Sequence, residues 1–227
     1  MNVALVVCAA PQADADVFYR QLITAHRGLV IAADAGGGVC LSHGRVPDLL
    51  VGDFDSIGSD VLEQVKASGA QLRRSPAEKD VTDLDLALEA VRDLDVGHAT
   101  VTAAWSARLD HTLSAIGSVF RHTELTIDLV DPDMAGWILD AEGRCSMTLS
   151  GPGAIFSLLA LDDKALVSCS GARYPLESAT LGALASRGLS NVVLETPAIV
   201  RVDRGRLLVL SHSVSGTDHA RFSTGSG

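Results

Sequence analysis

Short apolar runs alternate with amphipathic stretches through the first 130 residues of the chain. The predicted strands are 3–8, 29–33, 49–51, 70–73, 100–104 and 125–130, and the predicted helices are 13–25, 35–42, 61–67, 82–91 and 112–120. The helix over 82–91 is the clearest, because Leu84, Leu88 and Val91 recur on one face. This alternation predicts a mostly parallel sheet with helices on its faces, whose ligands bind beyond the carboxyl ends of the strands.

Beyond Pro132 the pattern changes to short apolar runs separated by turn residues. The predicted strands in this part are 136–139, 145–149, 154–160, 165–169, 190–194, 198–202 and 206–210. Short strands in close succession are typical of a β-sandwich or a small barrel. The polar, Gly- and Ser-rich end of the chain predicts a disordered tail. We therefore expect an α/β domain over 1–133, an all-β domain over 134–211 and a tail over 212–227.

The composition narrows the classes of function. Hydrophobic residues make up 47% of the 227 residues, which is enough for a sizeable core, and 28 acidic residues outnumber 18 basic ones. The chain has no run of Lys and Arg, which argues against nucleic-acid binding through a broad basic face. An acidic protein that handles phosphates needs metal ions or local cations to offset its own negative field.

The cysteines and the N-terminal segment bear on location. The four cysteines are scattered without a C-x-x-C pair, which predicts buried free thiols in a reducing compartment. The apolar start of the chain is short and has no positively charged residues before it, so it predicts a first strand rather than a signal peptide. No apolar stretch approaches the length of a membrane span. We expect a cytoplasmic protein without a membrane partner.

Three polar clusters follow predicted strands or open predicted helices. They are Gly52-Asp53-Phe54-Asp55-Ser56, Lys79-Asp80-Val81-Thr82-Asp83 and Arg108-Leu109-Asp110-His111. Mg²⁺ binds carboxylate oxygens and bridges to substrate phosphates, while the guanidinium group of Arg suits phosphate oxygens. The clusters therefore predict a magnesium and phosphate site at one rim of the sheet, together with Asp34, which directly follows another predicted strand.

Each cluster also has a purely structural interpretation. Asp and Ser form turns and cap helices, Thr82 with Asp85 approximates a capping box, and Asp110 could cap the helix that follows it. The glycines at 36–38 could serve only a tight turn, since they form neither a Walker A loop nor a dinucleotide fingerprint. Lys79 fits this interpretation less well, because a cation at a helix N-terminus is unfavourable unless it faces an anion.

The order of the motifs resembles the thiamine pyrophosphokinase family of bacteria. The matching motifs are Asp34-x-Gly36-Gly37, Gly52-Asp53-Phe54-Asp55-Ser56, Lys79-Asp80-x-Thr82-Asp83, Arg108-Leu109-Asp110-His111 and Leu189-Ser190-Asn191. The resemblance reaches to about Leu210. It implies an N-terminal α/β domain that binds nucleotide and carries the catalytic residues, and a C-terminal β-sandwich that binds thiamine. It also implies a homodimer with sites between subunits.

The same resemblance implies a reaction and a set of site residues. The β,γ-pyrophosphoryl unit of ATP, the co-substrate, moves onto the hydroxyl of thiamine, which gives thiamine diphosphate and AMP. The implied ligands of Mg²⁺ are Asp53, Asp55 and Asp83, and the implied catalytic residues are these three with Arg108 and Asp110. The implied ATP-binding residues are Asp34, Gly36, Gly37, Lys79, Asp80, Arg108 and His111, and those for thiamine are Ser190, Asn191 and Asp110.

Three departures from the family pattern concern the acceptor more than the chemistry. Residues 105–107 are Trp, Ser and Ala where many relatives have glycines, and residues 8–11 replace a Gly-rich loop. Residues 207–210 are aliphatic where some relatives have a Trp over the thiamine ring. Two alternatives therefore stay open: a pyrophosphokinase for another alcohol, such as 6-hydroxymethylpterin, and a non-catalytic nucleotide-binding regulatory protein.

Overall fold

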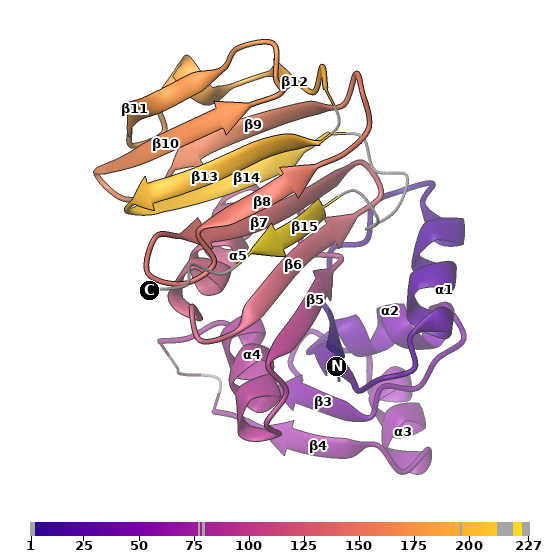
Figure 1. Cartoon of the computed structure of the whole chain (residues 1–227). Coiled ribbons are helices and arrows are strands. Elements are labelled where there is room, and N and C mark those ends of the chain that lie inside the picture. The colour runs from indigo at the N-terminus through magenta and orange to yellow at the C-terminus, as the bar shows by residue number, and fades with distance from the viewer. Residues whose placement is uncertain (1–2, 77, 79, 196, 213–219, 224–227) are drawn as a thin grey trace. The chain divides into compact units, whose positions relative to one another are not determined.

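The computed structural model describes residues 3–76, 78, 80–195, 197–212 and 220–223 of the chain (Figure 1). The chain divides into two compact units, Met1–Pro132 and Asp133–Gly227. Strands and helices alternate in the first unit, and the second consists almost entirely of strands, so the predicted fold class is confirmed. Among the described residues, no helix is long and apolar enough to cross a membrane.

The first unit contains a parallel sheet. Its strands are β1 (Val3–Val7), β2 (Val30–Ala33), β3 (Leu49–Gly52), β4 (Gln71–Arg74), β5 (His98–Thr102) and β6 (Thr126–Asp131). They lie in the order β6-β5-β1-β2-β3-β4, and every neighbouring pair is parallel. The helices are α1 (Asp16–Ala25), α2 (Gly36–Ser42), α3 (Ser59–Ala67), α4 (Asp83–Asp93) and α5 (Leu109–Arg121).

Helices cover both faces of this sheet. Leu5 and Val7 of β1 pack in one apolar cluster with Ile23 of α1, Val39 of α2 and Val65 of α3. Alternate residues of a strand point to one face, so α1, α2 and α3 share that face, while α4 and α5 lie on the other (Figure 1). Coverage of both faces explains why β1, β2 and β3 are continuous apolar runs, whereas β4 at the edge of the sheet is mostly polar and exposed. It leaves the carboxyl edge of the sheet as the place where polar side chains gather.

The second unit is a β-sandwich. Its strands are β7 (Met134–Asp140), β8 (Ser146–Leu149), β9 (Ile155–Ala160), β10 (Lys164–Ser170), β11 (Leu176–Gly182), β12 (Asn191–Val192), β13 (Ala198–Arg204), β14 (Arg206–Ser211) and β15 (Ala220–Ser223), with the short 3-10 helix η1 (Ser186–Gly188). Within this unit the strands form the antiparallel series β12-β9-β14-β7 and β11-β10-β13-β8-β15. Leu158 and Val209 of the first series share a core with Val167 and Val200 of the second. The sandwich, rather than the barrel, is therefore the fold of this unit.

The structure differs from the sequence-based expectation in two of these strands. β11 was not expected, because its alternation is interrupted at Ser178, which has φ 43° beside a register shift in the pairing with β10. β15 lies within the predicted disordered tail, yet it pairs with the edge of β8. An edge strand offers unpaired backbone groups to such a segment. The other predicted tail residues, 213–219 and 224–227, lie outside the described residues, as do 1–2, 77, 79 and 196.

Candidate active site

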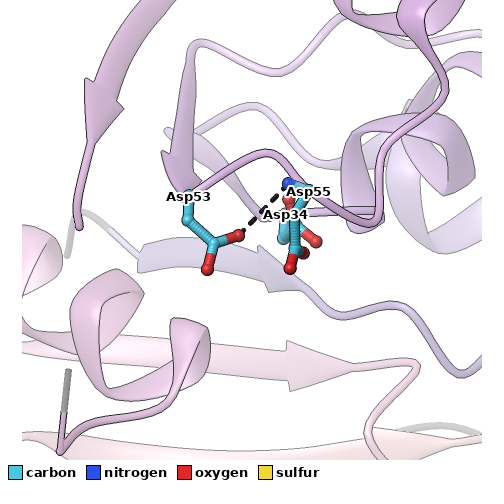
Figure 2. A group of neighbouring side chains, drawn as sticks. All are labelled: Asp34, Asp53 and Asp55. Carbon is cyan, nitrogen blue, oxygen red and sulfur yellow. Dashed lines mark hydrogen bonds between the residues drawn. The ribbon is translucent and has the colours of Figure 1, made fainter. Parts of the chain in front are cut away.

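Three carboxylates meet at the carboxyl edge of the parallel sheet. Asp34 follows β2, and Asp53 and Asp55 follow the neighbouring β3. One ligand oxygen from each residue lies within 4.8 Å of the other two (Figure 2). The residues that follow two neighbouring parallel strands lie at the same edge of the sheet. This is why residues about 20 positions apart in sequence come together. Three hard oxygen ligands at this spacing suit a divalent cation such as Mg²⁺.

The backbone around β3 bends sharply to present these carboxylates. Gly52 has φ 145° and Phe54 has φ 67°, and a Cβ on Gly52 would lie 3.0 Å from the Cβ of Asp34. Glycine at 52 therefore allows the two chain segments to approach. The backbone N–H of Asp55 donates to the Oδ1 of Asp53 over 3.2 Å, which closes the turn (Figure 2).

Asp34 is the electrostatically unusual member of the group. Its side chain is buried, and among the described residues its Oδ1 accepts no hydrogen bond. Burial raises the pKa of Asp34, and the nearby charge of Asp83 raises this pKa further, against hydrogen bonds from Ser56 and Ala35. A cation beside this oxygen would offset both the burial and the repulsion. The residues present therefore fit a bound divalent metal ion.

Asp83 lies close to this group without belonging to it. It is the first residue of α4, and its Oδ1 would be 3.2 Å from a Cβ placed on Gly52. The oxygens that meet within 4.8 Å come from Asp34, Asp53 and Asp55, whereas the predicted ligand set contains Asp83 in place of Asp34. Both aspartates face the same edge of the sheet, so four carboxylates surround one region.

A cavity of about 570 Å³ opens beside this group. Its walls come from five segments at the carboxyl edge: residues 8–10 after β1, 33–35 at the end of β2, Ser56 after β3, 81–84 at the start of α4, and the loop after β5 with the start of α5. Asp34 and Asp83 line it together with Arg108 and His111. The cavity thus brings residues of all three predicted polar clusters together with Asp34 and Ala35, the residues before the glycines at 36–38.

Arg108 and Asp110 form an ion pair at the N-terminus of α5. The Arg108 Nη2 lies 2.6 Å from the Asp110 Oδ2, and both side chains are about two-thirds exposed. The hydrogen bond and charge of Arg108 lower the pKa of Asp110. The N-cap of α5 is Arg108, without a side-chain cap, so the idea that Asp110 caps this helix is wrong. Its carboxylate is in the first turn, where it suits the helix dipole.

The capping box predicted at the start of α4 is present. The Oγ1 of Thr82 accepts from the backbone N–H of Asp85 over 3.1 Å, and the backbone N–H of Thr82 donates to the Oδ2 of Asp85 over 3.0 Å. Arg121 of α5 also donates to both carboxylate oxygens of Asp85. Asp85 is therefore structural, and the capped start of the helix holds Asp83 at the cavity.

A comparison with known proteins assigns the chain to a family. Residues 19–130 match the family described as thiamin pyrophosphokinase, catalytic domain. The chain belongs to the thiamine pyrophosphokinase family. Thiamine pyrophosphokinase of Bacillus subtilis is 32% identical over 105 residues, which are 45% of this chain and 49% of that protein. Thiamine pyrophosphokinase 1 of Arabidopsis thaliana is 27% identical over 183 residues, which are 75% of this chain and 67% of that protein.

Solved thiamine pyrophosphokinase structures share the fold of this chain. The Bacillus subtilis structure has a TM-score of 0.78 at 21% identity and covers 94% of this chain and 100% of its own. The Candida albicans structure has a TM-score of 0.76 at 14% identity and covers 94% and 89%. The sequence alignment, by contrast, spans about half the length of the curated Bacillus subtilis relative. The family match and the shared fold therefore agree with each other.

Two residues that the family resemblance links to thiamine lie in the sandwich unit. Asn191 is buried, and its side chain accepts from the backbone N–H groups of Tyr174 and Val192 and donates to the Tyr174 carbonyl. These hydrogen bonds give the side-chain amide of Asn191 a structural role. Ser190 is exposed at φ 53°, and its backbone N–H donates to the Oγ of Ser157. The Ser190 hydroxyl is thus the more accessible of the two polar groups.

The remaining expected thiamine pyrophosphokinase residues fall into two groups. Lys79 lies outside the described residues, and Asp80 is exposed just before α4. Gly36 and Gly37 begin α2, where a Cβ on Gly36 would lie 2.1 Å from the Val7 carbonyl oxygen. Glycine is therefore needed for α2 to approach β1, whatever else these residues bind.

The cavity also contains residues that were not among the predicted site residues. Cys8 lines it, and burial raises the pKa of its thiol to about 12, so the group is an inert wall residue. Ala9, Ala10 and Ser114 line it as well. Residues 8–10 could have been predicted to lie at the site, because they directly follow the first strand of a parallel sheet.

Proposed function

We propose that this chain transfers the pyrophosphoryl group of ATP to the hydroxyl of thiamine, which gives thiamine diphosphate and AMP. The observation that carries the proposal is the carboxylate group of Asp34, Asp53 and Asp55, in which a buried oxygen of Asp34 accepts no hydrogen bond in the described structure. Membership of the thiamine pyrophosphokinase family supplies the reaction that such a group would serve. The adjoining cavity of about 570 Å³ has room for a nucleotide's phosphates.

We assign the metal site to Asp53 and Asp55, with Asp34 and Asp83 as the carboxylates closest to complete it. Mg²⁺, when bound, supplies positive charge that neutralises the polyphosphate. The protein's own contribution is to hold these carboxylates in place through the bends at Gly52 and Phe54. Without the cation, burial of Asp34 and the nearby negative charge of Asp83 raise the pKa of Asp34.

In the proposed transfer, a bond forms between the hydroxyl oxygen of thiamine and the β-phosphorus of ATP. The bond between that phosphorus and the bridging oxygen to the α-phosphorus breaks, and AMP leaves with the electron pair. The hydroxyl proton is released. Arg108 clamps the polyphosphate together with Lys79, and Asp110 stands by the reacting hydroxyl. The exposed pairing of Arg108 with Asp110 is weak enough for a phosphate to replace the carboxylate.

We assign the remaining ATP contacts to Gly36, Gly37, Asp80 and His111, and the thiamine-binding loop to Ser190 and Asn191, with Ser190 as the residue that contacts thiamine. Because Asn191 uses its amide within the sandwich, its role is to shape the loop that carries Ser190. We further propose a homodimer whose sites combine residues of two subunits, working in the cytoplasm. Phosphoryl transfer to an alcohol needs little covalent help, so positioning and charge neutralisation provide most of the rate.

The test is AMP formation from ATP and Mg²⁺ with a panel of acceptors. Thiamine is expected to support turnover, whereas 6-hydroxymethylpterin and other alcohols are not. AMP formation with the pterin alone would assign a related pyrophosphokinase. ATP binding without AMP formation from any acceptor would assign a nucleotide-binding regulator.

A matched pair of variants tests the metal assignment. Asp53→Asn removes one ligand charge and keeps the side-chain size, so turnover is expected to fall by at least about 100-fold at saturating Mg²⁺. Asp60→Asn, an equally conservative change at an exposed position of α3, should leave turnover unchanged. Melting curves establish that both variants fold. Near-normal turnover of Asp53→Asn would remove Asp53 from the metal site.

A further inference from the structure

Asp131, the last residue of β6, is fully buried beside the cavity loops and faces only hydrogen-bond donors. Its Oδ1 accepts hydrogen bonds from the Tyr19 hydroxyl (2.8 Å), the Ala103 N–H (2.8 Å) and the Thr102 hydroxyl (3.2 Å). Its Oδ2 accepts hydrogen bonds from the Ala104 N–H (3.1 Å) and the Trp105 N–H (3.3 Å). Burial raises the pKa of Asp131, and these hydrogen bonds act in the opposite direction. A carboxylate with both oxygens engaged in this way holds its donors in fixed positions.

The donors belong to a strained segment. Ala103 directly follows β5 and has φ 55°, a left-handed conformation that costs a residue with a Cβ about 1–2 kcal/mol. Three successive backbone N–H groups, those of residues 103–105, converge on the one carboxylate. Such strain persists only where the surroundings determine the conformation, and here the surroundings are the oxygens of Asp131.

Tyr19 connects the same carboxylate to a second loop. Its hydroxyl donates to Asp131 and accepts from the backbone N–H of Gln12 over 3.0 Å. The two loops are also joined directly, because the N–H of Cys8 donates to the Thr102 carbonyl over 2.9 Å and the N–H of Ala10 donates to the Ala103 carbonyl over 2.8 Å. The loops after β1 and β5 therefore form one hydrogen-bonded unit around Asp131 and Tyr19.

The hydrogen bonds of this unit continue along the loop after β5 to Arg108, the cationic residue that lines the cavity. Beyond Trp105, the N–H of Ser106 donates to the Thr112 hydroxyl, and the Ser106 hydroxyl accepts from the N–H of Arg108 over 3.1 Å. Ala10, Ala104, Ser106 and Arg108 all line the cavity. A shift of residues 103–105 would thus move one wall of the cavity and the backbone of Arg108.

We propose that Asp131 and Tyr19 are positioning residues that set the cavity wall and the placement of Arg108, without touching the substrates. This inference rests on the proposed function only for its kinetic readout. The carboxylate orders the loop after β5, and the tyrosine hydroxyl transmits that order to the loop after β1. Positioning of this kind is catalytically valuable, because a 1 Å displacement of a reacting group can cost about 100-fold in rate.

A neighbouring pair provides the matched control. Asp128 lies on β6, three positions before Asp131, and its Oδ2 accepts from His98 of β5 over 2.8 Å. The Asp128–His98 pair thus joins the same two strands as Asp131 does. It lies toward the start of the strands, away from the edge that carries the loops. Asp128→Asn therefore matches Asp131→Asn in chemistry and strand but not in position.

The experiment compares Asp131→Asn, Tyr19→Phe, their double variant and Asp128→Asn in the full chain. Asparagine keeps the size of the side chain but turns an NH₂ donor toward groups that are themselves donors. We expect Asp131→Asn to lower kcat and raise the apparent KM for ATP, with kcat/KM reduced about tenfold or more. Tyr19→Phe should act in the same direction and less strongly, and the double variant should lose less than the product of the two single losses. Asp128→Asn should stay within about twofold of the parent.

Amide hydrogen exchange of residues 103–108 provides a second readout that needs no turnover. Exchange is expected to accelerate in Asp131→Asn and Tyr19→Phe and to match the parent in Asp128→Asn. Altered kinetics with unchanged exchange would overturn the inference, and so would a lowered Tm with unchanged exchange, kcat and KM. If Asp131→Asn does not fold, Tyr19→Phe decides by the same two measurements. A parent protein that makes no AMP from ATP and thiamine contradicts the proposed function, and exchange alone then decides the positioning role.

Discussion

At the scale of single residues, the candidate site combines a group of carboxylates that repel one another with Arg108, whose guanidinium group is paired with an exposed carboxylate. Asp34 is buried among like charges, and its environment favours the arrival of a cation. Arg108 has the opposite character, because it is exposed and paired with Asp110, two positions along the chain. Exposed pairs contribute little to stability, so Arg108 can exchange this partner for a polyphosphate. The residue geometry therefore predicts separate roles for Arg108 and Asp110.

Substitutions at Arg108 and Asp110 test those roles. Arg108→Ala is expected to lower kcat and raise the apparent KM for ATP, because a clamp on developing charge acts in the transition state as well as in the ground state. Arg108→Lys keeps the charge but loses the planar fork, so its impairment should be milder. Asp110→Asn should lower turnover and leave ATP affinity closer to normal. Steady-state kinetics and melting curves on all three variants measure this.

A purely structural role would give a different result. Asp110 would then only complement the dipole of α5, and Asn would replace it at little cost to turnover. Arg108 would be a surface residue whose removal leaves kcat and KM unchanged. Unchanged kinetics in all three variants would exclude this loop from the active site.

At the scale of elements, the glycines after β2 show how packing and binding requirements coincide. A Cβ on Gly36 would lie 2.1 Å from a backbone oxygen of β1, which cannot move without disturbing the sheet. A Cβ on Gly38, in the same helix, would meet only the Val61 side chain at 3.8 Å. The motif thus contains a glycine that the fold requires and another that it does not. Sequence alone cannot distinguish them, because both are glycines at the start of one helix.

This contrast gives a prediction for stability. Gly36→Ala is expected to destabilise the protein by about 1–3 kcal/mol, because the methyl group overlaps the Val7 carbonyl. Gly38→Ala should be neutral or stabilise by up to about 1 kcal/mol, since alanine has the higher helix propensity. Denaturant unfolding of both variants measures the difference. Equal free energies of unfolding would show that α2 does not pack against β1 as described.

At the scale of the whole molecule, the alternation of strands and helices was enough to predict the fold class and the edge that carries the site. It could not predict which carboxylates meet, because the approach of Asp34 to Asp53 depends on β2 and β3 being neighbours. The role of Asp131 was equally hidden, since its donors lie 26 to 29 residues away or, for Tyr19, 112 away. Long-range contacts of this kind leave no local pattern.

The proposed homodimer makes a prediction about mixed subunits. If a site takes Asp53 from one subunit and Ser190 from its partner, Asp53→Asn and Ser190→Gly are defects of different halves of the site. Glycine suits the φ of 53° at position 190 and removes the side chain with its hydroxyl group. Each variant alone should be impaired at limiting thiamine.

After equal mixing and exchange, half of the dimers are hybrids with one intact site each, so about a quarter of the parent activity should return. Exchange is measured with a tagged copy of one variant. Demonstrated exchange without recovery would mean that one chain supplies the whole site.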